Sequence, residues 1–163
     1  MIQAAVLTVS DSASRGERAD ESGDAIVQLL GEIDAQIVAR EVVPDDQAEI
    51  EGAFVRLAEQ ADLVVSTGGT GVSPRDVTPE AVRAVIDKEL PGFGEAMRSR
   101  SLEKTPKAIL SRSLAGTRGG TLIVSLPGSP KAVRECLEVV LPAIPHGIEI
   151  ASGQGGRCGE HGG

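Results

Sequence analysis

Short apolar runs alternate along this chain with amphipathic stretches of helical spacing. The runs cover residues 3–9, 63–65 and 121–126, and polar or glycine-containing sequence follows each one. Residues 36–43 read as a further strand, which stops at Pro44. Strands that are apolar throughout are typical of parallel sheets with helices on both faces. Residues 113–116 are expected to pair with 121–126 across the TRGG turn. The pattern predicts an α/β fold, a three-layer sandwich around a mainly parallel sheet with a short antiparallel hairpin.

Helix signals fill the segments between these runs. Ser22 and Thr78 are plausible N-caps, Asp45 and Asp46 open another helix, and Pro79 suits a first helical turn. Further helices are expected over 91–102 and 131–141, with a shorter one over 105–112, whereas 10–24 reads as a loop. Residues 1–151 then form one domain, and the glycine-rich tail 152–163 is expected to be disordered.

Composition excludes several classes of function. Only two of 163 residues are aromatic, and the formal net charge is −8, which argues against nucleic acid and anionic membranes as partners. The chain has no run of 18 apolar residues and no basic segment before its first apolar run, so no membrane span or signal peptide is expected. Cys136 and Cys158 form no CxxC pair, which favours a reduced, cytoplasmic protein with Cys136 in the core.

Polar loops follow the predicted strands at 10–16, 44–46, 66–79 and 126–130. Ligands of parallel sheets bind where the strands end, so these loops are expected to meet at one site. In the third loop, glycine amides and the hydroxyls of Thr67, Thr70 and Ser73 suit an anionic group. The alternative is that the glycines only permit a tight turn. The loop matches neither the Walker pattern nor GxGxxG.

Two carboxylates accompany this loop, Asp45 after Pro44 and Asp76 after Arg75. Each one alone could simply cap a helix or a turn. Together, beside an anion-binding loop, they are the ligands that Mg²⁺ on a triphosphate requires.

Several segments in order resemble one family. STGGTGVSPRDVTPEA, preceded by VVPDD and followed by PGFGEAMR, TPKAILSRSLAGTRG and LPGSPKAV, is similar to the adenylyltransferase branch of the molybdenum cofactor biosynthesis family, over about residues 4–151. The resemblance implies a homotrimeric enzyme that transfers AMP from Mg-ATP to the terminal phosphate of molybdopterin, releases pyrophosphate and hands its product to a molybdenum insertase. A pterin-binding paralogue with little activity and a nucleotide-binding module without pterin are the alternatives.

The resemblance also implies roles for individual residues. Asp45 and Asp76 match the catalytic, magnesium-associated aspartates. The positions that match or accompany the ligand-binding segments are Ser10, Asp11, Gly68, Gly69, Thr70, Gly71, Ser73, Ser111, Ser125, Pro127 and Gly128. Several relatives carry Asn at the position of Ser125, so the alternative there is a serine that only caps its strand.

Overall fold

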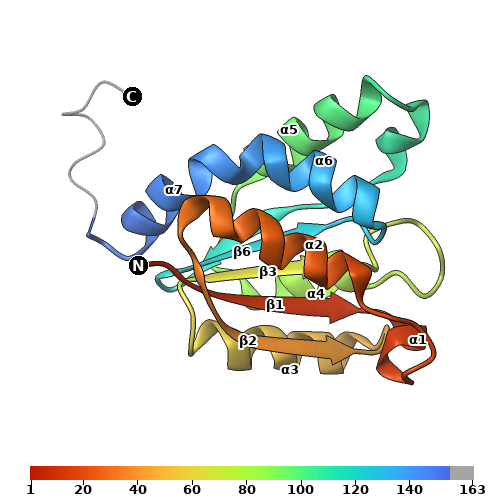
Figure 1. Cartoon of the computed structure of the whole chain (residues 1–163), viewed down its shortest axis with the longest axis horizontal. Helices are drawn as coiled ribbons and strands as arrows, with labels where there is room; N and C mark the ends of the chain where they lie inside the picture. The colour runs from red at the N-terminus through yellow and green to blue at the C-terminus, as the bar shows by residue number, and fades with distance from the viewer. Residues whose placement is uncertain (155–163) are drawn as a thin grey trace.

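A six-stranded sheet in the order β2-β1-β3-β6-β5-β4 forms the middle layer of the computed structural model, which describes residues 1–154 (Figure 1). The strands are β1 (Gln3–Val9), β2 (Gln36–Val43), β3 (Leu63–Thr67), β4 (Lys88–Glu89), β5 (Ala115–Arg118) and β6 (Thr121–Leu126). The four strands β2, β1, β3 and β6 are parallel. β5 pairs antiparallel with both β6 and β4, which confirms the predicted mainly parallel sheet with an antiparallel hairpin.

Helices cover both faces of the sheet. On one face lie α2 (Glu21–Leu30), α5 (Pro91–Leu102), α6 (Pro130–Val140) and α7 (Ile144–Ala151); on the other lie α3 (Gln47–Ala58) and α4 (Thr78–Val85). Successive side chains of β1 enter opposite clusters: Ala4 and Val6 face α2 and α6, and Ala5 and Leu7 face α3 and α4. Each large apolar side chain buried in these clusters contributes roughly 1.5–3 kcal/mol. In the described part of the chain, no helix is long and apolar enough to cross a membrane.

Two predicted helix caps are wrong. The cap of α2 is Asp20, whose Oδ1 accepts a hydrogen bond from Gly23 N–H at 2.9 Å. Ser22 already lies inside the helix, and its hydroxyl donates to the Gly128 carbonyl at 2.6 Å. Thr78 is the first residue of α4, because the cap is Val77, whose carbonyl accepts from Ala81 N–H at 3.1 Å, and the Thr78 hydroxyl makes no cap bond.

Other boundaries differ by a few residues. The predicted loop 10–24 contains a short helix, α1 (Asp11–Ser14), which Ser10 caps by accepting a bond from Ala13 N–H at 3.2 Å. β5 begins at Ala115 and runs to Arg118, because only Gly119 and Gly120 are left for the turn. The shorter helix expected over 105–112 is a 3₁₀ turn, η2 (Pro106–Leu110). The predicted disordered tail covers residues 152–163, of which 155–163 lie outside the described residues.

Candidate functional site

The polar loops after β1, β2, β3 and β6 meet at the carboxyl edge of the parallel strands. Two adjoining cavities open there, of about 340 and 460 Å³. Gly69, Asp76 and Gly128 line both of them. The two cavities therefore share one wall, and groups bound in them would lie next to each other.

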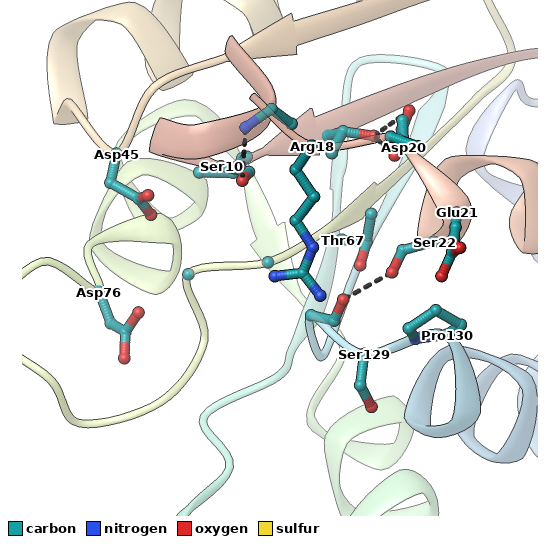
Figure 2. Close-up of a pocket in the computed structure, with 17 residues that line it drawn as sticks. Ser10, Arg18, Asp20, Glu21, Ser22, Asp45, Thr67, Asp76, Ser129 and Pro130 are labelled. Atoms are coloured by element: carbon teal, nitrogen blue, oxygen red, sulfur yellow. Dashed lines mark hydrogen bonds between the residues drawn. The ribbon is translucent and has the colours of Figure 1, made fainter. Parts of the chain in front are cut away.

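Hydroxyl and charged groups line the smaller cavity, which we call the polar cavity (Figure 2). Its polar side chains include Ser10, Arg18, Asp45, Thr67, Asp76 and Ser129. Figure 2 shows Asp45 and Asp76 on one side and the Arg18 side chain extending through the middle. Among the described residues, the Arg18 guanidinium forms no ion pair. Ser129 caps α6, so a helix N-terminus also points at this cavity.

Asp11 and Asp45 hold their two loops together by a reciprocal pair of hydrogen bonds. Asp45 N–H donates to Oδ1 of Asp11 at 2.9 Å, and Asp11 N–H donates to Oδ2 of Asp45 at 3.1 Å. Arg75 adds two bonds to the Asp11 carboxylate, at 3.1 and 2.9 Å. The Asp11 side chain is therefore committed to the scaffold and lies beside the polar cavity.

The carboxyl groups of Asp11 and Asp45 differ in their electrostatic environment. The hydrogen bond from Arg75, followed by the one from Asp45 N–H, lowers the pKa of Asp11. Burial raises the pKa of Asp45, and the charges of Asp11 and Asp76 add to that rise, against a lowering by Asp11 N–H. A bound cation would relieve the cost of ionising Asp45.

Asp45 is not the helix cap. That role belongs to its neighbour Asp46, whose Oδ1 accepts a hydrogen bond from Glu49 N–H at 3.0 Å at the start of α3. Asp76 does close a turn, because its Oδ2 accepts a bond from Ser73 N–H at 3.0 Å. Its Oδ1 has no hydrogen-bond partner among residues 1–154, and the residue lines both cavities. One oxygen of Asp76 thus stays available for a ligand.

Two glycines bring the third loop close to these carboxylates. Gly68 and Gly69 have φ values of +99° and +69°, which side-chain-bearing residues rarely adopt. A Cβ at Gly68 would collide with the Val9 carbonyl, and one at Gly69 would collide with the Thr78 hydroxyl and lie 3.2 Å from Oδ1 of Asp45. The conformational role of the glycines is therefore present, and it places the loop backbone against Asp45.

The larger cavity, which we call the apolar cavity, lies between the third loop, α5, η2 and α6. Met97, Ala108, Leu110, Pro127, Ala132 and Cys136 supply its apolar wall. Polar groups at its edge include Arg98, Lys107 and Ser111. Cys136 is 2% exposed, and burial raises the pKa of its thiol, so the group stays protonated near neutral pH.

The structure brings most of the predicted site residues to these two cavities. Ser10, Asp45 and Gly68 line the polar cavity, Thr70, Gly71, Ser111 and Pro127 line the apolar cavity, and Gly69, Asp76 and Gly128 line both. Ser73 lies in the exposed loop before Asp76. Ser125 lies elsewhere: it is fully buried, and its hydroxyl donates to the Leu114 carbonyl at 3.1 Å and accepts from Leu114 N–H.

Sequence reasoning missed Arg18 and Ser22. Arg18 occurs in a stretch that reads as an ordinary charged loop, so no local signal marked it. Ser22 has the signature of a helix cap, which concealed its hydrogen bond to Gly128, 106 residues away in sequence. Ser129 stands in the LPGSP turn as a recognisable N-cap, and that signal was available.

Comparisons with known proteins give consistent results. The MoCF_biosynth family model, described as a probable molybdopterin binding domain, matches residues 5–146. A molybdopterin adenylyltransferase of Helicobacter pylori (strain J99) is 48% identical over 156 residues, covering 93% of this chain and 89% of the relative. The molybdopterin adenylyltransferase of Escherichia coli (strain K12) is 42% identical over 151 residues, covering 88% and 77%.

Solved structures agree with the sequence comparisons. The crystal structure of the molybdopterin biosynthesis enzyme MoaB from a Thermus species superposes with a TM-score of 0.88 at 47% identity. The superposition covers 94% of this chain and 98% of that one. The similarity therefore extends through both cavities.

Proposed function

This chain belongs to the molybdenum cofactor biosynthesis family whose model describes a probable molybdopterin binding domain, and from that membership we propose that it is a molybdopterin adenylyltransferase. The reaction transfers AMP from Mg-ATP to the terminal phosphate of molybdopterin and releases pyrophosphate. The observation that carries this proposal is the pair Asp45 and Asp76 at one polar cavity, with an apolar cavity sharing the Asp76 wall. Identity of 48% to a relative with that name, over most of both chains, supports it.

In this reaction the protein has to align the two substrates and stabilise the charge that develops on the phosphoryl oxygens. An oxygen of the molybdopterin phosphate forms a bond to the α-phosphorus of ATP. The bond from that phosphorus to the oxygen bridging the α- and β-phosphates breaks, and pyrophosphate leaves with its electron pair. A phosphate is already ionised near pH 7, so neither a protein nucleophile nor a general base is needed.

Asp45 and Asp76 are the residues that would hold Mg²⁺. The raised pKa of Asp45 and the free Oδ1 of Asp76 fit a cation better than they fit a purely structural role. When bound, Mg²⁺ supplies positive charge to the triphosphate oxygens. Arg18 and the N-terminus of α6 would contact phosphoryl oxygens from the other side of the polar cavity.

We assign the pterin ring system to the apolar cavity and the triphosphate to the polar cavity. A flat heterocycle gains from the apolar wall of Met97 and Pro127, and its polar edge can reach Ser111. A nucleotide-binding module without pterin would leave this cavity unexplained. A weakly active paralogue would not need two carboxylates at the polar cavity.

Three further proposals do not come from the geometry of the site. The resemblance implies that the chain forms a homotrimer and passes its adenylylated product to a molybdenum insertase. The absence of a CxxC pair favours action in the cytoplasm.

The decisive experiment incubates the purified protein with molybdopterin, ATP and Mg²⁺ and detects adenylylated molybdopterin and pyrophosphate together. We expect both products in equal amounts, and neither when ATP or molybdopterin is omitted. Binding of molybdopterin with no product in the complete mixture would support the weakly active paralogue instead. Binding of ATP alone would support the nucleotide-binding module.

A further inference from the structure

Arg112 reaches from the segment before β5 to the loop that follows β3. Its backbone N–H donates to the Thr70 carbonyl at 2.8 Å. Its guanidinium donates from Nε to the Gly71 carbonyl at 2.8 Å and from Nη2 to the Asp76 carbonyl at 3.0 Å. Nη1 pairs with the Glu80 carboxylate at 2.6 Å on the first turns of α4. One side chain therefore contacts three positions of the segment that carries Asp76.

The two carbonyls are the two ends of one exposed loop, residues 71–76. Because the guanidinium is planar and its donors are fixed relative to one another, it fixes the separation of Gly71 and Asp76. A lysine has a single ammonium group and cannot impose that geometry.

Within this loop, no buried apolar side chain fixes the positions of the two ends. Its large apolar side chain, Val72, is 64% exposed, and the residues at 73–75 are exposed as well. Inside the loop, Ser73 N–H donates to the Asp76 carboxylate at 3.0 Å, Asp76 N–H donates to the Ser73 carbonyl at 2.9 Å, and Arg75 N–H donates to the Ser73 hydroxyl at 3.3 Å. The middle of the loop is also tied to α1 by the bonds from the Arg75 guanidinium to Asp11. The shape of the loop therefore depends on polar contacts, and Arg112 supplies those that anchor both ends.

We propose that Arg112 is a positioning residue for adenylyl transfer, which holds the Asp76 carboxylate at the wall shared by the two cavities. The proposal rests on the proposed function, because it assigns Arg112 the task of aiming a group that acts there. Loss of the guanidinium would let the loop ends separate, and displacements of about 1 Å cost on the order of 10²-fold in rate.

The ion pair with Glu80 is secondary in this account. The side chains of Arg112 and Glu80 are 34% and 40% exposed, and ion pairs of that exposure contribute little to global stability. The main effect of losing Arg112 is therefore expected in the geometry of the loop rather than in the melting temperature.

Arg118 offers a matched control. Its guanidinium donates from Nη1 to the Val85 carbonyl at 2.8 Å, at the opposite end of α4. Like Arg112, it joins the hairpin region to the α4 region through a backbone carbonyl and lines neither the polar nor the apolar cavity, but its hydrogen bond goes to Val85 and not to the loop 71–76.

The experiment compares Arg112→Met, Arg112→Lys and Arg118→Met with the wild type. Hydrogen exchange of peptides spanning 70–78 is measured without ligands, along with molybdopterin affinity, turnover, the Mg²⁺ concentration for half-maximal turnover and the melting temperature. For Arg112→Met we expect faster exchange at 71–76, turnover at least tenfold lower, a higher Mg²⁺ requirement and molybdopterin affinity within about threefold. Arg112→Lys should fall between it and the wild type, and Arg118→Met should keep wild-type turnover and exchange at 71–76.

Two results would overturn the proposal: wild-type exchange and turnover in Arg112→Met, or losses of turnover in both Met variants that simply follow their melting temperatures. If Arg112→Met does not fold, Arg112→Lys decides by the same measurements. A wild-type protein that produces no adenylylated molybdopterin would refute the proposed function and this inference together. An active wild type with an unaffected Arg112→Met would refute the inference alone.

Discussion

Asp45 and Asp46 are adjacent in sequence but have different roles, so the same Asp→Asn substitution can be compared at the two positions. Asp46 caps α3 through its bond from Glu49 N–H, and asparagine caps a helix about as well as aspartate. Asp46→Asn should therefore change stability by less than about 0.5 kcal/mol and leave turnover unchanged. Asp45→Asn removes a charge from the polar cavity one residue earlier.

The stability cost at Asp45 can be worked from its contacts. Asparagine keeps an oxygen that can accept the bond from Asp11 N–H, but the bond becomes neutral, at a cost of about 1 kcal/mol. Removing a carboxylate whose ionisation is opposed by burial and by Asp11 and Asp76 works in the other direction. The net change should stay within about 1 kcal/mol, a melting shift of roughly 2–4 °C or less.

Turnover should respond far more strongly. Loss of one preorganised charged group typically lowers a rate by about 10²-fold or more, equivalent to roughly 2.7 kcal/mol. The assay measures adenylylated molybdopterin and thermal unfolding on both purified variants. Near-wild-type turnover in Asp45→Asn, or an equal loss in Asp46→Asn, would refute the assignment of the cation to Asp45.

Three other predictions concern the same site, and a fourth concerns assembly. Asp76→Asn should keep molybdopterin binding and the Ser73 turn while turnover falls about 10²-fold, and unchanged turnover would leave Asp76 as a turn residue only. Carboxyl NMR should show the pKa of Asp45 above, and that of Asp11 below, the ordinary range of aspartates, and Mg²⁺ should lower the pKa of Asp45. Asp45 then stabilises the fold at low pH, and this stabilisation is lost as pH rises through its raised pKa. Asp11 stabilises the fold above its unfolded pKa, and this stabilisation is lost as pH falls through its lowered pKa. Arg18→Met should weaken pyrophosphate binding about tenfold in calorimetry, whereas Arg15→Met, which loses only the exposed pair with Glu17, should not. Light scattering should give about three times the 16.8 kDa chain mass, and a monomer mass would exclude the trimer.

The fold was predictable where a strand is buried on both faces of the sheet, because such a strand must be apolar throughout. β1 and β6 match the predicted runs, because a strand covered by helices on both sides tolerates few polar residues and so has clear ends. The edge strand β2 is only partly buried, and its predicted end was set by Pro44 instead. β5 was displaced by two residues because a turn of two glycines looks the same in sequence as a longer TRGG turn. Ser22 and Thr78 are residue types that often cap helices, but tertiary contacts decide where α2 and α4 begin.

The site was predictable where a local motif fixes its geometry. The glycine loop and the two aspartates stand in recognisable segments, and the topology brings them together. Arg18 and Arg112 act across the fold, and nothing in their immediate sequence reports which carbonyl or cavity they reach. Ser125 shows the opposite error: its place beside LPG suggested a ligand contact, whereas its hydroxyl is bonded to Leu114, just before β5.

The hydrogen bonds across the site also constrain when it can exist during folding. The Thr67 hydroxyl donates to the Pro127 carbonyl, 60 residues away, and Ser22 donates to Gly128, 106 residues away. Pairing of β3 with β6 must close these long loops before the walls of either cavity meet, and such non-local contacts form slowly. During synthesis, a chain that ends before β6 carries both aspartates but lacks the wall that follows this strand. Closure of both cavities therefore marks completion of the parallel sheet at β6.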